Sequence, residues 1–222
     1  MDIAMIDFKQ ARFNMVEQQV RPWNVLDFGV LDILNEVPRE DFVPQAYRNL
    51  AYSDIAIPIG HGEEMLHPKY QGRILQALMV KPGETVLEVG TGTGYLTALL
   101  AKMAEHVYSV DVEPDFLKTA AANLSKQNIT NVTLEEGDGS RGWPEHGPYD
   151  AIAITGSMEK AYDELKASLK IGGRLFVVIG EGPTMEAMLY TRTGENSWDE
   201  VALFETDIAR LHNATKPQEF EF

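Results

Sequence analysis

The 222-residue chain contains no cysteine. This excludes disulfides, thiolate zinc sites and cysteine nucleophiles together, and it is compatible with a reducing cytoplasm. Positive charge is also scarce, because 19 Lys and Arg residues stand against 34 Asp and Glu residues, for a formal net charge of −15. Proteins that bind along a nucleic-acid backbone or an anionic membrane surface need clustered Lys and Arg side chains, and the sequence has no such cluster. Nucleic acid and membrane are therefore not expected as partners.

Long hydrophobic runs are missing as well. The longest apolar stretches, such as Leu175–Ile179, are far shorter than the ~20 residues that a membrane-spanning helix needs. The N-terminal segment Met1–Asp7 carries acidic residues where a secretory signal carries basic ones. We therefore expect a soluble, cytoplasmic protein, and the sequence does not distinguish Met1 from Met5 as the start.

Apolar residues make up 44% of the chain, which is enough for the core of one domain spanning residues 1–222. Their spacing predicts a mostly helical N-terminal elaboration with an active-site loop over residues 1–80. The segment Leu26–Val37 has helical spacing that places Leu26 on the buried side, and a further helix is expected to begin at Pro68. Residues 55–62 are rich in Gly and Pro and predict an extended segment that enters a loop. The side chains expected to point inward from the helix at Pro68 are those of Ile74, Leu75, Leu78 and Met79.

Beyond the N-terminal part, residues 81–222 alternate short β-rich runs with helical patterns. Such alternation predicts an α/β core with a mostly parallel sheet and helices on both faces. The last two strand-like runs, 187–193 and 200–206, are separated by a polar turn, so the sheet is expected to end with an antiparallel strand. The earlier strands are expected at 85–89, 107–112, 132–134, 149–154 and 174–179.

The most informative segment is a predicted strand that runs into three glycines at alternate positions, Gly90, Gly92 and Gly94. Glycines let the backbone turn sharply and pass close beneath a ligand. The spacing differs from the G-x-G-x-x-G fingerprint of dinucleotide-binding folds, because Tyr95 stands where that fingerprint has its third glycine, and no Gly-Lys-Ser/Thr of a phosphate loop follows. Glu88, just before the loop, favours a ligand with an ammonium group and disfavours a phosphate.

Two further carboxylates follow at the ends of predicted strands. Asp111 lies 17 residues after Gly94, near the offset at which open α/β sheets place a carboxylate on ribose hydroxyls. Asp138, between Gly137 and Gly139, is placed to reach an adenine amino group. Carboxylates offered in order to an amino-acid end, a ribose and an adenine describe S-adenosylmethionine rather than NAD or ATP. Taken alone, Asp111 also fits a helix N-cap and Asp138 a turn residue.

The order of these motifs resembles the protein-L-isoaspartate O-methyltransferase family of class I S-adenosylmethionine-dependent methyltransferases, over roughly residues 30–180. The resemblance rests on Val37–Pro44, Ile57–Gly62, Glu88–Gly94, Gly137–Gly139, Pro148–Ile152 and Leu169–Leu175. It implies a Rossmann-like seven-stranded sheet, S-adenosylmethionine as cofactor, and methylation of isoaspartyl carboxylates in damaged proteins or peptides, a repair reaction. The cofactor-binding residues expected on this basis are Glu88, Gly90, Thr91, Gly92, Gly94, Asp111, Val112, Asp138, Gly139 and Thr155.

Two segments depart from the pattern of that family. Where the family usually has Thr-Ile-Ser-x-Pro, this chain has Glu64–Pro68, so Leu66 takes the place of the active-site serine. The closing segment is Ile208–His212 in place of an Arg-Phe-Val-Pro-Leu-like strand. We therefore expect Leu66 and His67 at the active site. The methyl acceptor stays open between an isoaspartyl carboxylate, a different protein or small-molecule acceptor, and none at all in a non-catalytic cofactor-binding module.

The expected chemistry needs no general base, because a carboxylate acceptor with an ordinary pKa of ~3.9 is already ionised at neutral pH. Alignment and desolvation remain for the protein to supply, and His67 is a candidate for orienting the acceptor. His61 and His67 flank Glu63 and Glu64, but this spacing does not match H-E-x-x-H. A solvated loop is therefore favoured over a metal site. The sequence indicates no oligomeric state.

Overall fold

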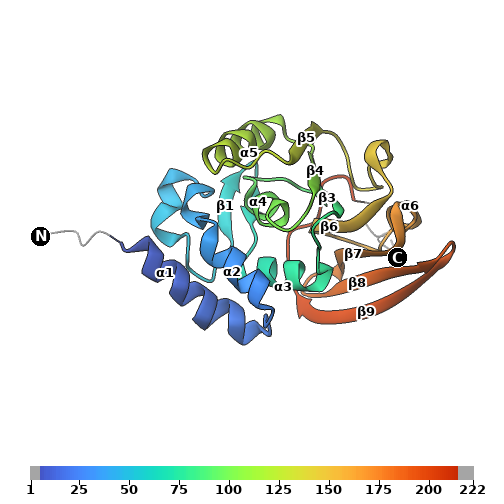
Figure 1. Ribbon diagram of the computed structural model, residues 1–222, viewed down its shortest axis with the longest axis horizontal. Helices are drawn as coiled ribbons and strands as arrows, with labels where there is room; N and C mark the ends of the chain where they lie inside the picture. Colours follow the sequence, from blue (N-terminus) through green and yellow to red (C-terminus); the bar gives the residue numbers. More distant parts are fainter. Residues whose placement is uncertain (1–5, 215–222) are drawn as a thin grey trace, which may run out of the picture.

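The centre of the protein is a seven-stranded sheet that begins with parallel strands and ends with an antiparallel hairpin (Figure 1). A computed structural model describes residues 6–214 of the chain. The strands are β3 (Thr85–Val89), β4 (His106–Asp111), β5 (Val132–Glu136), β6 (Tyr149–Met158), β7 (Leu169–Glu181), β8 (Thr184–Gly194) and β9 (Ser197–Thr206). Their order is β5-β4-β3-β6-β7-β8-β9, with β3 to β7 parallel and β8 and β9 antiparallel. Strands β3 to β5 are therefore added toward one edge of the sheet, and β6 and β7 toward the other, starting again beside β3. Such a switch in strand order leaves a ligand crevice at the carboxyl ends of the strands.

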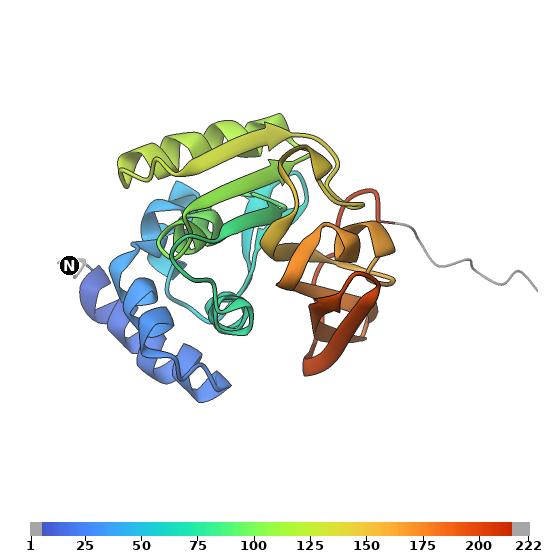
Figure 2. The same ribbon diagram turned by 45° about the vertical axis from the view of Figure 1, so that its right-hand side comes forward.

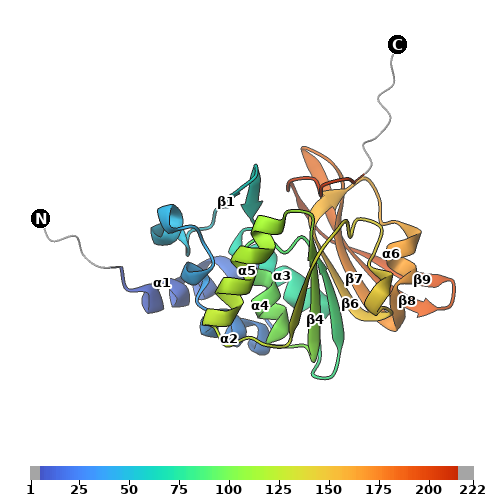
Figure 3. The ribbon, with the colours of Figure 1, turned by 90° about the horizontal axis from the view of Figure 1, so that it is seen from above.

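Helices cover both faces of this sheet unequally. Figure 3 shows α3, α4 and α5 on one side, together with the N-terminal helices, and α6 on the other. Figure 2 shows the β8–β9 hairpin at the opposite edge of the sheet from β5 and α5. None of the helices within residues 6–214 is long and apolar enough to cross a membrane. The helices are α1 (Phe8–Met15), α2 (Phe28–Glu36), α3 (Pro68–Leu78), α4 (Tyr95–Ala101), α5 (Pro114–Lys126) and α6 (Asp163–Ala167), with a π turn η1 (Val16–Val20) and 3-10 turns η2 (Arg21–Trp23), η3 (Arg39–Asp41), η4 (Gln45–Leu50) and η5 (Pro144–His146).

The buried core follows from the two-residue period of the central strands, which sends alternate side chains to opposite faces. Val86 belongs to the cluster that packs between the sheet and the N-terminal helices, α3 and α4. Its neighbour Leu87 belongs to a second cluster on the other face, with Leu165 of α6. Because both faces are covered, β3 is buried almost throughout, as expected for a parallel strand with helices on each side.

A smaller two-stranded antiparallel hairpin, β1 (Ile57–Gly60) and β2 (Glu63–Met65), stands apart from the large sheet (Figure 3). It realises the extended segment expected at 55–62. The helix that follows begins at Pro68, as predicted, since a proline at the first helical position loses no helical hydrogen bond.

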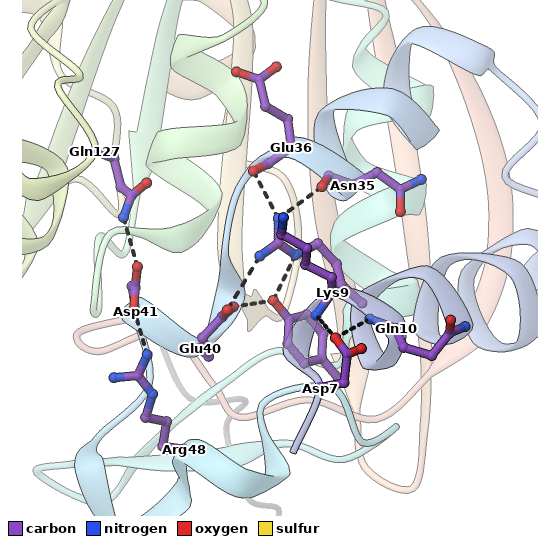
Figure 4. A network of polar contacts seen from close by, with 11 residues as sticks. Asp7, Lys9, Gln10, Asn35, Glu36, Glu40, Asp41, Arg48 and Gln127 are labelled. Carbon is purple, nitrogen blue, oxygen red and sulfur yellow. Dashed lines mark hydrogen bonds and ion pairs between the residues drawn. The ribbon is translucent and has the colours of Figure 1, made fainter. Parts of the chain in front are cut away.

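The N-terminal helices are fastened to one another by Arg12. Its Nη1 atom donates to the carbonyl oxygen atoms of Asn35 and Glu36, at 2.9 and 3.1 Å, near the C-terminal end of α2. Its Nη2 atom contacts Glu40 at 3.3 Å. Figure 4 labels these three partners, which come from the end of α2 and from η3. Carbonyls at a helix end lack partners within the helix, so this arginine caps α2 from α1.

Asp41 links the N-terminal part to the α/β core. One of its oxygens accepts from Arg48 at 3.1 Å and the other from Gln127, the residue that caps α5, at 2.9 Å (Figure 4). The helical elaboration is therefore attached to the face of the sheet by polar contacts as well as by the shared apolar core.

Two side chains are exposed to solvent, although the helical spacing predicted that they are buried. Leu26 precedes the first turn of α2 and is 59% exposed. Met79 is 64% exposed, because α3 ends at Leu78 and Met79 caps it in the left-handed conformation, with φ at +46°. Both predictions were wrong for the same reason: helical spacing was extended past the ends of the helices. Ile74, Leu75 and Leu78 are buried as predicted.

Candidate active site

A pocket of about 450 Å³ lies at the carboxyl ends of β3, β4 and β6. Three groups of residues line it: the glycine loop with the ends of these strands, the segment from β1 to the start of α3, and the segment 207–212. The last of these pairs with β6 through Ser157, whose N–H donates to Ala209 at 2.8 Å and whose carbonyl accepts from Leu211 at 2.9 Å. The size is within the ~300–1,000 Å³ typical of small-molecule sites.

The glycine loop has the backbone conformation that its composition predicts. Gly90, Gly92 and Gly94 all have positive φ, at +95°, +52° and +87°. A Cβ on Gly90 would lie 2.0 Å from Oγ1 of Thr155, and one on Gly94 would lie 3.0 Å from the Cβ of Ala120. Larger residues at Gly90 or Gly94 would therefore clash with the neighbouring side chains and push the loop away from them.

Glu88 is fully buried beside this loop and lines the pocket. Its Oε2 atom accepts hydrogen bonds from Thr97 at 2.5 Å and Ser109 at 2.6 Å, whereas Oε1 has no partner within residues 6–214. Burial raises the pKa of this carboxyl to about 8, against the lowering effect of the two hydroxyls. A buried carboxyl oxygen without a partner is costly, so this atom is suited to a positively charged group of a ligand.

Asp111 ends β4 on the same side of the pocket. Its Oδ2 atom accepts from the N–H of Gly92 at 2.9 Å, and its Oδ1 atom accepts from the N–H of Glu113 at 3.0 Å. Each carboxylate oxygen can accept a further hydrogen bond. The N-cap of α5 is Glu113 rather than Asp111, so the helix-capping alternative for Asp111 is not realised.

The remaining expected cofactor residues also line the pocket, except Gly94, which lies against Ala120 of α5. Asp138 accepts from the N–H of Ser140 at 2.9 Å, so the turn contact anticipated for it is present at the same time. The hydroxyl of Thr155 donates to the carbonyl oxygens of Val89 and Gly90, both at 3.0 Å, and thereby holds the start of the glycine loop. The other members of this group that line the pocket are Thr91, Val112 and Gly139.

Leu66 and His67 belong to a second wall of the pocket, formed by the segment between β2 and α3, and both line the pocket. Leu66 packs against the apolar core. His67 precedes the first residue of α3, and its Nδ1 atom lies 3.0 Å from Oδ1 of Asp54. The structure thus brings both residues to the same pocket as the glycine loop, more than twenty residues away in the chain.

Sequence reasoning missed the buried arginine behind this wall. Arg39 donates to the backbone carbonyls of Leu66 and Ala51, both at 2.8 Å, and to the side chain of Gln71. Its guanidinium lies 5.0 Å from the ring centre of Tyr95, and burial lowers its pKa to about 10. The arginine therefore fixes the backbone of residue 66 against the start of α4.

Ser109 was missed as well, although its signal is present in the sequence. It is a hydroxyl residue within an apolar strand, and it lies directly beside Glu88 in the β3–β4 register. A polar side chain at a buried strand position needs a partner, so a polar residue on each of two neighbouring strands could have been paired.

His61 and His67 do not converge. The ring of His61 lies 3.4 Å from a carboxylate oxygen of Glu113 and 3.7 Å from one of Asp115, whereas His67 contacts Asp54. Glu63 has a third histidine as partner: it lies 2.8 Å from His212 of the closing segment. These contacts join β1–β2 to α5 on one side of the pocket and to residues 207–212 on the other.

This fold and pocket define a class I S-adenosylmethionine-dependent methyltransferase. The carboxylates follow successive parallel strands, the glycine loop separates β3 from α4, and the antiparallel hairpin closes the sheet. The model of the protein-L-isoaspartate(D-aspartate) O-methyltransferase family matches residues 11–206. The chain belongs to this family.

Individual relatives agree with this assignment. The chain is 39% identical over 180 residues to a protein-L-isoaspartate O-methyltransferase of Gloeobacter violaceus, covering 81% of this chain and 88% of the relative. It is 40% identical over 187 residues to protein-L-isoaspartate O-methyltransferase 1 of Rhodopseudomonas palustris, covering 84% and 76%.

Solved structures show the same fold. One, a protein-L-isoaspartate O-methyltransferase, has 26% identity and a TM-score of 0.78; the match covers 90% of this chain but spans 65% of that one. Another, a putative member from Plasmodium falciparum in complex with S-adenosyl-L-homocysteine, has a TM-score of 0.77 at 21% identity, with 93% and 99% coverage. The predicted fold class and family resemblance are confirmed.

Proposed function

We propose that this protein transfers a methyl group from S-adenosylmethionine to the free carboxylate of isoaspartyl residues in proteins or peptides. One observation carries the proposal beyond family membership: the buried carboxyl of Glu88, with one oxygen unpartnered within residues 6–214, lines the same pocket as residues 64–67. A cationic cofactor end and an acceptor can therefore be held in one pocket. Substrate proteins of the cytoplasm, as expected from the sequence, are part of this proposal.

On the cofactor side, four groups of this chain have distinct roles in the proposal. Glu88 accepts from the ammonium group of the cofactor's amino-acid end. Asp111 accepts from ribose hydroxyls, and Asp138 from the adenine amino group. The glycine loop, held by Thr155, supplies a backbone surface without Cβ atoms. When bound, S-adenosylmethionine supplies an electrophilic methyl group on a sulfonium centre.

On the acceptor side, the protein needs only to align and desolvate an anion that is already ionised. Arg39 fixes the backbone of Leu66, and α3 begins directly after His67. The acceptor carboxylate would be held between this wall and the cofactor, and S-adenosylhomocysteine would be the leaving group of the transfer. No proton has to leave the acceptor before the transfer.

The test is methyl transfer from cofactor labelled in its methyl group to a peptide that contains one isoaspartyl residue. The matched control is the same peptide with an ordinary aspartyl residue. We expect label in the first peptide and little in the second. Base treatment should release the label as methanol, because a methyl ester hydrolyses in base and an N-methyl group does not. Binding of the cofactor without label in the isoaspartyl peptide would contradict the proposed acceptor.

A second candidate is a methyltransferase of the same family with an apolar acceptor. It is favoured by the side chain of Leu66, which lines both the main pocket and a small apolar cavity beside it. That cavity is bounded also by Tyr70, Phe176, Phe204 and Ile208. Label recovered only in a small molecule from cell extract would support this candidate, and no label anywhere would support a non-catalytic module.

A further inference from the structure

His67 is held by a carboxylate that carboxylate methylation does not itself require. Its Nδ1 atom lies 3.0 Å from Oδ1 of Asp54, in the loop that precedes β1. With Nδ1 engaged, the other ring nitrogen, Nε2, has no hydrogen-bond partner within residues 6–214. His67 is one of the residues that line the pocket, next to Leu66. A histidine oriented at one nitrogen and open at the other is the arrangement by which proteins present an imidazole to a ligand.

Asp54 is itself fixed by a lysine. Its Oδ2 atom accepts from Nζ of Lys69 at 2.8 Å, and the lysine side chain is only 13% exposed. The ammonium group lies 4.6 Å from the ring centre of Trp23 and 5.4 Å from that of Tyr70, a position that favours a cation. Partial burial would raise the pKa of Asp54, but hydrogen bonds from Lys69 and His67 lower it overall. Asp54 is thus an oriented, ionised carboxylate.

The segment 63–67, here called the acceptor wall, lacks a hydrogen-bond donor for an anionic acceptor, and His67 can supply one. Leu66 offers no side-chain donor, and the wall carries the carboxylate of Glu64, which repels an anionic acceptor, whereas Glu63 is paired with His212. In the imidazolium form of His67 both ring nitrogens carry hydrogens: Nδ1 donates to Asp54 and Nε2 is left for an acceptor. A hydrogen bond from such a ring nitrogen to a carboxylate is charge-assisted.

We propose that Asp54 and Lys69 are positioning residues which hold His67 so that its Nε2 atom donates to the acceptor carboxylate. The pair provides the donor that residue 66 lacks. This inference rests on the proposed isoaspartyl acceptor. It assigns His67 to binding rather than to proton removal, so its loss weakens acceptor affinity more than turnover.

The test compares His67→Leu, His67→Gln, Asp54→Asn and the double variant His67→Leu/Asp54→Asn, with an isoaspartyl peptide as substrate. A Gln amide can donate near the place of Nε2, whereas Leu cannot donate. We expect His67→Leu to raise KM by about tenfold or more, as for loss of a hydrogen bond to a charged group, with a smaller change in kcat. His67→Gln should recover most of the loss. Asp54→Asn should be intermediate, and the double variant should equal His67→Leu, because Asp54 acts through His67.

Matched controls are His106→Leu, at the other end of the sheet, and Asp163→Asn, an exposed aspartate paired with a lysine on α6. Neither should change KM. Calorimetry with S-adenosylhomocysteine should show cofactor affinity unchanged in all variants, which also shows that they are folded.

Three results would overturn the inference. An unchanged KM in His67→Leu would show that His67 does not bind the acceptor. An equal loss of kcat in His67→Leu and His67→Gln would indicate that His67 acts as a base. Additive effects in the double variant would show that Asp54 does not act through His67. Failure of the proposed function gives a different result: the wild-type protein then binds the cofactor but does not methylate the isoaspartyl peptide. In that case the role assigned to His67, Asp54 and Lys69 is contradicted as well.

Discussion

Oδ2 of Asp111 accepts a hydrogen bond from the N–H of Gly92 at 2.9 Å, so the carboxylate at the end of β4 holds the loop at the end of β3. A backbone contact, Gly90 N–H to the carbonyl of Val110 at 2.8 Å, joins the same two segments two residues earlier in the loop and one residue earlier on β4. The residue proposed for the ribose and the loop proposed for the amino-acid end are therefore one structural unit. A substitution at either position is therefore expected to weaken the binding of both the ribose and the amino-acid end of the cofactor.

Asp111→Ala should weaken the binding of S-adenosylhomocysteine by about 10- to 100-fold, or ~1.5–3 kcal/mol, the usual contribution of hydrogen bonds to a charged group. It removes both the proposed ribose contacts and the bond that holds Gly92. Calorimetry measures the affinity, and Asp163→Ala on α6 is the control for an exposed aspartate. Unchanged affinity in Asp111→Ala would contradict the ribose assignment.

The stability of the unliganded protein should fall as pH rises, through Glu88. Burial raises the pKa of this carboxyl to about 8 in the folded protein, whereas it is about 4.3 in an unfolded chain. Between these values the folded state holds a proton that the unfolded state has lost. The free energy of unfolding therefore decreases from about pH 4 to about pH 8 through this group, and the effect is complete above pH 8.

Glu88→Gln should remove that contribution, since an amide does not titrate in this range. Denaturant unfolding at pH 5, 6.5 and 8 should show a smaller decrease for Glu88→Gln than for wild type. The same variant should bind the cofactor less tightly, because an ammonium group favours the ionised form of Glu88, which an amide cannot adopt. Parallel pH dependences in the two proteins would show that Glu88 does not titrate as stated.

The glycine loop can be tested with two substitutions that share the same backbone strain. Gly90 and Gly83 both have φ near +90°, at +95° and +90°. A Cβ on Gly83 would meet nothing within 4 Å, whereas one on Gly90 would meet Oγ1 of Thr155 at 2.0 Å. Gly83→Ala should cost about 1–2 kcal/mol of stability from the left-handed conformation alone.

Gly90→Ala should cost clearly more than Gly83→Ala, and it should also abolish or strongly weaken cofactor binding, because the Thr155 hydroxyl must leave the two carbonyls that it holds. Chemical denaturation and calorimetry on both variants measure the two effects. If Gly90→Ala and Gly83→Ala lose the same stability and Gly90→Ala still binds the cofactor, the side chain of Thr155 can move away from the added methyl group without affecting stability or binding.

Much of the fold was predictable because it depends on local patterns. The strand at Thr85–Val89 was predicted with its observed bounds, and the terminal hairpin and the helix at Pro68 were predicted from turn residues and a proline. Helix ends were less predictable, since capping at Met79 depends on a left-handed residue that apolar spacing does not reveal.

The site divides in the same way. Glycines and carboxylates at strand ends could be predicted, because parallel strands bring their carboxyl ends to one edge. Contacts between loops could not be. Asp54 contacts His67 at the open end of the β1–β2 hairpin, and Glu63 contacts His212 from 149 residues away. No periodicity relates such positions, and only the packed structure brings them together.

At the position of Leu66, a hydroxyl would add a second donor on the acceptor wall. Leu66→Ser should raise kcat/KM for an isoaspartyl peptide. One hydrogen bond to a charged acceptor contributes roughly 1.5–3 kcal/mol, but the net gain is smaller because Leu66 packs against the core and its loss leaves space. Leu66→Ala is the matched control, since it removes the same bulk without adding a hydroxyl. The difference between the Ser and Ala variants therefore isolates the hydrogen bond. If both variants lose activity equally on the isoaspartyl peptide, the leucine acts as an apolar wall that the acceptor requires, and the apolar-acceptor candidate gains over the repair reaction.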